Sequence, residues 1–361
     1  MKLRTRSLSL VTAVVVAIVF SANVSLAGEL SETQACVQRG YKLLKNRNAI
    51  AAAVLDADTA QTMMFGAAFE NEIFEIGSVT KTFTANLLAQ SILAGKLRLS
   101  DPIPLGYQKP GNTISYQGLT THTSGIIPGT FPGFNPENPL APFAGLTIPV
   151  FKSLYEKTPL AAPSGTTWSY SNMGTALLGL ILSENGAVSY EALVSDKIFK
   201  MLGMRDSYFE VPKSESARFP KGRMLDQSGT AQEMPHWDLY ETAIDPAGGI
   251  RSTIGDMVKY ARANLAPEKT PLAEAIELTH RPLYYIRDFQ MWIGMNWIIQ
   301  PDKNLIWHNG ETYGFNSIVA VSPKKRQAVV ALTDTTVLKT DPQGQQAFDT
   351  SLQKVAFDCL K

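Results

Sequence analysis

Runs of residues typical of β-strands lie near both ends of this 361-residue chain, with mostly helical patterns between them. One apolar run covers residues 50–55, and four others cover residues 291–299, 305–308, 315–321 and 328–332. Short strands satisfy their backbone groups by pairing, so runs at the two ends are expected to meet. We therefore predict one sheet that is completed by both ends of the chain and flanked by helices.

Helices are expected on either side of this sheet, because apolar residues recur there at helical spacing. Residues 29–47 and 253–264 show this pattern. A last helix is expected to present one apolar face made of Phe348, Leu352, Val355 and Cys359.

Residues 97–246 differ from the two flanking parts. This block is rich in proline and glycine, above all over 128–142, and contains shorter helical patterns at 173–182 and 190–201. Strand alternation is not evident in it. The pattern predicts a mostly helical insertion into an α/β part formed by residues 28–96 and 247–361.

The first 27 residues have the pattern of a secretory signal peptide. Lys2, Arg4 and Arg6 precede the apolar run 11–20, and Ser25-Leu26-Ala27 places small residues at both positions that a signal peptidase reads. An uncleaved membrane anchor is the alternative, although the run is shorter than the roughly 20 residues of a spanning helix. We expect a secreted or periplasmic protein with no transmembrane span after cleavage.

Only two cysteines occur, Cys36 and Cys359. Export to an oxidising compartment would allow a disulfide between them. Two buried free thiols are the alternative, because a single pair of cysteines does not define a disulfide framework.

The charge balance and the spacing of possible metal ligands indicate neither a cofactor nor a nucleic-acid partner. Lys and Arg total 33 against 32 Asp and Glu, so the chain has no net field for a polyanion or an anionic membrane. His236 and His280 lack a partner at metal-ligand spacing, and no metal is expected. The Gly-x-Ser-x-Gly motif of α/β-hydrolases is also missing from the sequence.

Ser78 and Lys81 lie three residues apart at the start of an expected helix. Gly77 precedes the serine, and a helical pattern continues to Gly95. Residues three apart share a helix face, so the lysine would lie beside the serine hydroxyl, which needs a base to become a nucleophile. The same spacing at Ser322 and Lys325 falls in a polar turn between strands and is expected to be solvated.

Tyr170-Ser171-Asn172 is the only Tyr-x-Asn in the chain. A phenol can act as a base when a lysine charge stabilises its phenolate, and an amide can hold the lysine or a substrate carbonyl. A tyrosine that merely caps a loop is the alternative.

These motifs resemble those of class C β-lactamases and their relatives among low-molecular-weight penicillin-binding proteins, D-amino-acid peptidases and serine esterases. The resemblance covers most of the mature chain. Its anchors, in order, are Ser78-Val79-Thr80-Lys81, Tyr170-Ser171-Asn172 and His308-Asn309-Gly310. The stretches 119–125, which contains His122, 202–207 and 246–253 also look like the family.

The resemblance implies an α+β fold of the β-lactamase/transpeptidase type, with an antiparallel sheet, flanking helices and an inserted helical domain. It also implies that Ser78 is acylated, that Lys81 and Tyr170 share proton transfer, and that Asn172 contacts the substrate amide. Which of Lys81 and Tyr170 removes the serine proton stays open.

The third motif would line the site. The resemblance places His308, Asn309 and Gly310 on a sheet strand along the site, and assigns the oxyanion hole to the backbone N–H groups of Ser78 and Glu311. It gives His122 a supporting role.

His308 departs from the β-lactamase pattern, which usually has a lysine at this position. A histidine has an ordinary pKa near 6.5, so it would carry little charge at pH 7 and more in mild acid. We therefore expect anionic substrates to bind better at mildly acidic pH. A histidine with a merely structural role on the strand is the alternative.

The sequence thus predicts a hydrolase that acts through a serine acyl-enzyme on β-lactams or on D-Ala-D-Ala cell-wall peptides. A carboxylesterase with the same mechanism is the runner-up. A penicillin sensor or wall-binding protein that is acylated without turnover is the alternative from another class. The substrate is expected to be a small molecule or a peptide, and the oligomeric state stays open.

Overall fold

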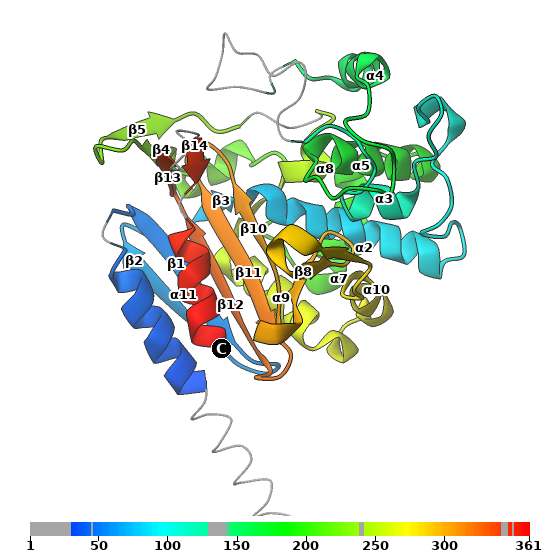
Figure 1. The fold of residues 1–361 in the computed structure, drawn as a ribbon. Helices are drawn as coiled ribbons and strands as arrows, with labels where there is room; N and C mark the ends of the chain where they lie inside the picture. The colour runs from blue at the N-terminus through cyan, green and yellow to red at the C-terminus, as the bar shows by residue number, and fades with distance from the viewer. Residues whose placement is uncertain are drawn as a thin grey trace, which may run out of the picture.

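An eight-stranded sheet, antiparallel at every junction, lies at the centre of the fold (Figure 1). In spatial order the strands are β2 (Ala60–Gly66), β1 (Ala49–Leu55), β12 (Gln327–Thr333), β11 (Asn316–Ser322), β10 (Leu305–Glu311), β9 (Ile298–Gln300), β8 (Met291–Ile293) and β7 (Tyr284–Ile286). Strands from the two ends of the chain meet where β1 pairs with β12, so the predicted sheet is confirmed.

The computed structural model describes residues 30–44, 46–128, 143, 145–237, 242–340, 346–348 and 350–361. The predicted signal peptide, residues 1–27, lies outside these ranges, as does most of the proline-rich stretch 128–142.

Strand β1 shows why both faces of the sheet must be covered. Its sequence, Ala-Ile-Ala-Ala-Ala-Val-Leu, contains no polar side chain, and every residue is buried. Successive side chains of a strand point to opposite faces. Ala51, Ala53 and Leu55 accordingly join the core on one side of the sheet, whereas Ile50 and Val54 join a second core on the other.

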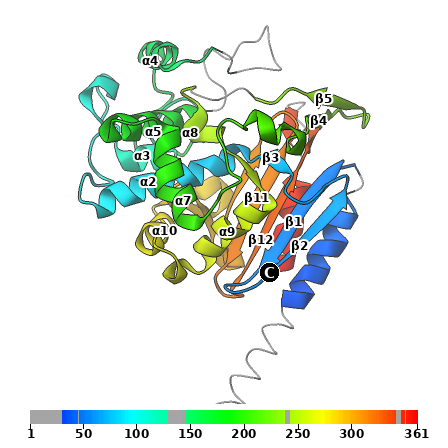
Figure 2. The same cartoon turned by 180° about the vertical axis from the view of Figure 1, so that it is seen from behind.

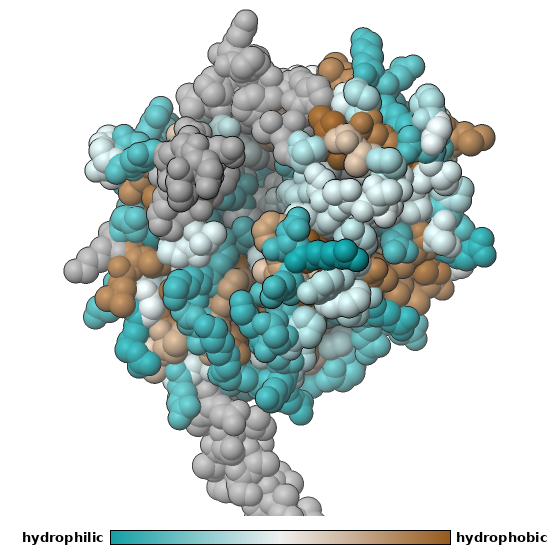
Figure 3. Space-filling model, in the orientation of Figure 1, coloured by the Kyte–Doolittle hydropathy of each residue, from teal (hydrophilic) through white to brown (hydrophobic). Residues whose placement is uncertain are grey.

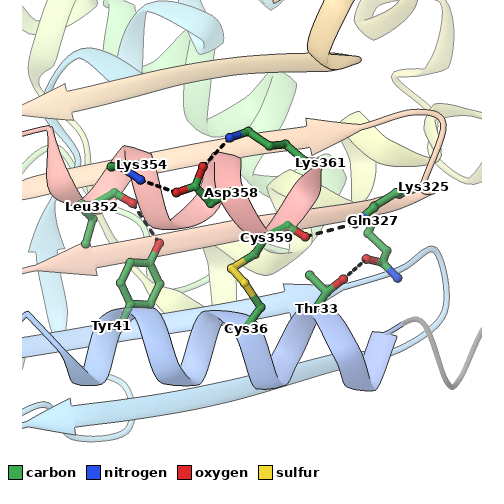
Figure 4. The surroundings of a disulfide bond; sticks show 10 residues. All are labelled: Thr33, Cys36, Tyr41, Lys325, Gln327, Leu352, Lys354, Asp358, Cys359 and Lys361. Carbon is green, nitrogen blue, oxygen red and sulfur yellow. Dashed lines mark hydrogen bonds and ion pairs between the residues drawn. A yellow bond between two sulfur atoms is a disulfide. The ribbon is translucent and has the colours of Figure 1, made fainter.

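The second core is covered by helical residues 30–42 and by α11 (Ser351–Leu360), which lie side by side on one face of the sheet (Figure 1). A disulfide joins Cys36 to Cys359 across the two helices (Figure 4). Close by, the Tyr41 hydroxyl donates to the Leu352 carbonyl at 3.2 Å. The expected last helix forms, but Phe348 belongs to the short strand β14 (Gln346–Phe348), because α11 begins only at Ser351.

The first core is covered by the other helices, which lie on the opposite face of the sheet and beyond its β7 end (Figures 1 and 2). They are α2 (Thr80–Leu93), α3 (Tyr116–Thr120), α4 (Ile148–Lys157), α5 (Asn172–Gly186), α6 (Tyr190–Val194), α7 (Lys200–Leu202), α8 (Asp245–Gly248), α9 (Ile254–Leu265) and α10 (Ala273–Thr279). Helix α9 packs on the sheet with Met257, Tyr260 and Ala261 buried.

Two smaller sheets accompany the large one, and the first of them corrects one expectation. The block 97–246 contains strands β4 (Gly222–Leu225) and β5 (Ala231–Met234), which join β13 (Thr335–Thr340) and β14 in a four-stranded sheet. β4 pairs antiparallel with β5 and parallel with β13. Each of the two strands is only four residues long, and most of β5 is exposed, so neither shows the apolar alternation that would have revealed it.

The other small sheet pairs β3 (Ile73–Glu75) with β6 (Arg251–Thr253). The expected strand 291–299 is also divided into β8 and β9. A turn separates them, with the Gly294 amide donating to the Trp297 carbonyl at 2.8 Å.

Hydrophilic residues cover most of the described surface on the face shown in Figure 3, and hydrophobic residues lie there in separate groups. None of the helices in the described ranges is long and apolar enough to cross a membrane.

Candidate active site

The turn that carries Ser78 is held against strand β10. Ser78 is the middle residue of a single 3-10 turn, Gly77–Val79, which continues into α2. The Ser317 hydroxyl donates to the Ile76 carbonyl at 2.8 Å. A methyl group on Gly310 would lie only 1.8 Å from the same carbonyl oxygen, so only glycine allows β10 to approach this closely. This contact brings Ser78 to the Glu311 end of the strand.

Lys81 lies in the first turn of α2 and is fully buried. Its Nζ donates to the Ser78 Oγ at 2.9 Å and to the Ala247 carbonyl at 2.6 Å. Burial holds the pKa of the Lys81 ammonium well below its usual value. The same contact therefore allows a neutral Lys81 amine to accept the Ser78 proton.

Helix α8 supplies the carbonyl that holds Lys81. Besides the Ala247 carbonyl, the adjacent Pro246 carbonyl accepts a hydrogen bond from the Thr84 Oγ1 at 2.7 Å. Since Thr84 lies one turn after Lys81 on α2, two consecutive carbonyls of α8 are fixed to one helix face. The Thr84 bond thus holds α8, and with it the Ala247 carbonyl, against the helix that carries Lys81.

Tyr170 lies in the segment just before α5, and its ring centroid is 5.0 Å from the Lys81 Nζ. Burial raises the pKa of the Tyr170 phenol, and a hydrogen bond with Ser78 opposes this rise. The phenolate form is therefore disfavoured, whereas the neutral amine of Lys81 is favoured.

Asn172 follows as the first residue of α5, and the Ser171 hydroxyl caps this helix by accepting from the Gly174 amide at 3.0 Å. Both Asn172 and Tyr170 are partly exposed. This cap fixes the start of α5 at Asn172, directly after the segment that carries Tyr170.

His308 lies on β10 and is only 3% exposed. Its Nδ1 is 2.6 Å from the Asn309 carbonyl oxygen, so Nδ1–H donates and Nε2 carries the lone pair. Burial, followed by the Lys81 charge, lowers the pKa of His308 to about 3. The expectation that His308 becomes charged just below pH 6.5 is therefore wrong, because burial disfavours the charged ring.

The structure brings Ser78, Lys81, Tyr170 and His308 together, with the Tyr170 and His308 ring centroids 6.4 Å apart. Asn309 and Glu311 are partly exposed on β10, and the Asn316 Nδ2 lies 3.3 Å from a carboxylate oxygen of Glu311.

Two groups at the site were not predicted. One is the Ala247 carbonyl. The other is Asn296, which has a φ of +58° and donates from Nδ2 to the Lys81 carbonyl at 3.2 Å. A backbone acceptor leaves no residue-type pattern, although Ala247 does fall in the family-like stretch 246–253.

The second Ser-x-x-Lys match has a different setting. Ser322 is the last residue of β11 and is buried, so the expectation that it is solvated is wrong. The Ser322 hydroxyl accepts from Asn304 at 3.1 Å, and Lys325 donates to the Cys359 carbonyl at 3.3 Å, beside the disulfide (Figure 4). In the described part of the chain, no group of three or more His, Cys, Asp or Glu residues is placed to hold a metal ion.

The chain is similar to known proteins in sequence and in fold. A β-lactamase of Pseudomonas fluorescens is 27% identical over 79% of this chain and 88% of its own length. Penicillin-binding protein 4 of Amycolatopsis lactamdurans is 30% identical over 57% of this chain and 55% of its own. The crystal structure of a class C β-lactamase superposes with a TM-score of 0.72 at 21% identity, and the match covers 94% of this chain and 99% of the other.

The sequence model of the family described as Beta-lactamase matches residues 35–351, a range that contains Ser78, Lys81, Tyr170 and His308. Because the match spans nearly the whole described chain, this protein belongs to the beta-lactamase family.

Proposed function

We propose that this protein is a serine hydrolase that works through an acyl-enzyme on Ser78. The observation that carries the proposal is the 2.9 Å contact between the Ser78 Oγ and the Nζ of a fully buried Lys81. A serine needs a base within hydrogen-bond reach, and a lysine can be that base only when its surroundings favour the neutral amine.

In the proposed acylation, the neutral Lys81 amine takes the Ser78 proton as Oγ attacks the substrate carbonyl carbon. The oxyanion that forms is stabilised by the backbone N–H groups of Ser78 and Glu311. Tyr170, held beside both Ser78 and Lys81, passes the proton to the departing nitrogen or oxygen. Asn172 contacts the substrate amide from the start of α5.

Deacylation repeats these steps with water. A water molecule gives a proton to the Lys81–Tyr170 pair while its oxygen attacks the acyl carbon. Ser78 then leaves and takes the proton back, so the enzyme returns to its starting state.

The substrates we propose are β-lactams and D-Ala-D-Ala peptides, as the names of the β-lactamase and penicillin-binding relatives suggest. One observation favours a second candidate, a carboxylesterase. The buried, neutral His308 provides no charge for a substrate carboxylate, so uncharged esters lose nothing at this position. A sensor that is acylated without turnover would need the same Ser78.

We also propose that the protein acts outside the cytoplasm. The signal-like pattern of residues 1–27 supports this location, and so does the disulfide between Cys36 and Cys359, a bond that persists in oxidising compartments.

The test compares turnover of nitrocefin, a D-Ala-D-Ala peptide and p-nitrophenyl acetate, together with the intact mass of the protein after exposure to penicillin. We expect one penicilloyl adduct in the wild type and in the control Ser322→Ala, and none in Ser78→Ala. Turnover of the first two substrates supports the leading proposal, and turnover of the ester alone supports the esterase. A stable adduct without turnover indicates a sensor. An adduct on Ser78→Ala would overturn the assignment.

A further inference from the structure

His122 hydrogen-bonds the chain on both sides of Tyr170. Its backbone carbonyl accepts from the Ser169 amide at 2.8 Å, and its side-chain Nδ1 accepts from the Ser171 amide at 3.2 Å. The two bonded amides are the immediate neighbours of Tyr170, so one residue fixes where the tyrosine lies between them.

The His122 side chain also contacts the tyrosine itself. The ring centroids of His122 and Tyr170 are 4.5 Å apart at an interplanar angle of 41°. On its other side, the His122 ring is 6.5 Å from that of Trp168. His122 is 2% exposed, so its ring serves as a buried support behind a partly exposed tyrosine.

From these contacts we propose that His122 is a positioning residue that sets the distance of the Tyr170 hydroxyl from Ser78 and Lys81. The inference rests on the proposed function of that site. A shift of about 1 Å in a catalytic group can cost on the order of 10²-fold in rate. The ring contact and the two hydrogen bonds restrict that shift.

The backbone around His122 supports the same role. The Thr123 carbonyl accepts from the Gly165 amide at 2.7 Å, and the Gly125 carbonyl accepts from the Ala161 amide at 2.8 Å. Residues 122–125 therefore run along the segment that ends at Tyr170. His122 bonds this segment through both its side chain and its backbone.

The hydrogen bond from the Ser171 amide fixes the tautomer of His122. Since Nδ1 accepts a hydrogen bond from the Ser171 amide, the neutral ring carries its own proton on Nε2. This Nε2 is buried and has no hydrogen-bond partner among the described residues. Burial, with the Lys81 charge behind it, holds the pKa of His122 well below its usual value, which preserves the accepting Nδ1.

The φ of His122 is +57°, a left-handed conformation that asparagine adopts more readily than most residues. Asparagine also places a carbonyl oxygen near the position of Nδ1, whereas glutamine places it farther out. His122→Asn is therefore the conservative variant, and His122→Gln and His122→Ala remove the acceptor. His280→Ala is the control for loss of a partly buried histidine ring, because His280 packs on Trp297 with ring centroids 5.2 Å apart.

The experiment is a double-mutant cycle with Tyr170→Phe, read as kcat on the best substrate together with thermal stability. We expect His122→Ala and His122→Gln to lower kcat about 10- to 100-fold, and His122→Asn to recover most of it. In the Tyr170→Phe background the same changes should cost less than about threefold, because a residue that acts through Tyr170 has nothing left to position.

Additive losses in the cycle, or equal losses for asparagine and glutamine, would overturn the proposal. If His122→Ala does not fold, the comparison of asparagine with glutamine still decides the question. His280→Ala should reduce stability without coupling to Tyr170→Phe. If wild-type Ser78 forms no adduct and none of the three substrates is turned over, the proposed function is overturned instead, so the two failures are distinct.

Discussion

The backbone of Gly77 lies so close to Glu311 that a methyl group on Gly77 would be 2.5 Å from the Glu311 amide nitrogen. Gly77 also has a φ of +49°, which disfavours any other residue. We predict that Gly77→Ala lowers kcat/KM by about 10²-fold or more, the usual cost of losing one oxyanion donor. The control Gly95→Ala has a similar φ of +68° with no atom within 4 Å, and should lose about 1 kcal/mol of stability with unchanged kcat/KM. Equal kinetics for the two variants would contradict the prediction.

Tyr170→Phe should keep the fold and slow turnover by about 10² to 10⁴, the range for loss of a general acid-base group. The hydroxyl removed is the part of Tyr170 that bonds Ser78, and the ring that packs on His122 remains. Steady-state kinetics with a circular dichroism spectrum would check this. Wild-type turnover would show that Lys81 transfers protons without the phenol.

Because the pKa of His308 is lowered to about 3, we predict that substrate preference does not change in mild acid. The ratio of kcat/KM for a penicillin to that for a neutral ester should stay constant from pH 7.5 to 5, because His308 stays uncharged throughout. His308→Lys should raise the ratio by up to about fivefold, as expected for one partly solvated ion pair. His308→Gln, which adds no charge, is the control. A ratio that rises near pH 6.5 in the wild type would show that His308 titrates there.

Loss of the disulfide should reduce stability without changing catalysis. The Cys36–Cys359 bond closes a loop across a sequence separation of 323 residues. In the chain-entropy view a loop of this length contributes about 6 kcal/mol, and we expect a measured loss of about 2 to 5 kcal/mol, the usual range for a native disulfide. Urea unfolding of the Cys36→Ser/Cys359→Ser variant would measure this. Because both helices lie on the face of the sheet opposite α2, kcat/KM below the transition should match the wild type. Two thiols that alkylate in unreduced exported protein would contradict the bond.

Asp245 should make the folded protein less stable as the pH rises. Burial and then the neighbouring Glu191 raise the pKa of the Asp245 carboxyl to about 9. A pKa that is higher in the folded state gives a contribution that is complete below about pH 4 and is lost progressively toward pH 9. Asp245→Asn removes that loss. At pH 8 the variant should therefore have a higher melting temperature than the wild type, and this difference should be smaller at pH 4. The exposed Asp226, changed to asparagine, is the control. An unaltered pH profile in Asp245→Asn would rule this out.

The middle of the central sheet could be predicted because β1, β11 and β12 contain long apolar runs, whereas the mostly exposed β2 and the short β7 at its two edges were not predicted. A strand such as β1, buried on both faces, has no alternative to a covered position in a sheet. The turn that divides β8 from β9 was missed, because Asn296 adopts its left-handed conformation among buried residues that no local pattern reveals.

The site could be predicted as residue types but not as charge states. Ser78, Lys81 and Tyr170 occur in recognisable motifs, and the structure places their side chains together. The burial of His308 depends on the strands and on Lys81 around it, and it was this burial that reversed the expected behaviour in acid.

The carbonyl of Ala247 that accepts from the Lys81 Nζ affects which amino-acid substitutions can disturb the lysine. A side-chain ligand can be deleted by one codon change, but a main-chain oxygen is present whatever residue occupies position 247. Single substitutions at position 81 would therefore reveal the importance of Lys81, whereas those at position 247 would leave its backbone hydrogen bond in place. Only changes that displace the α8 backbone, such as those at Pro246 or at Thr84 beneath it, can release the lysine.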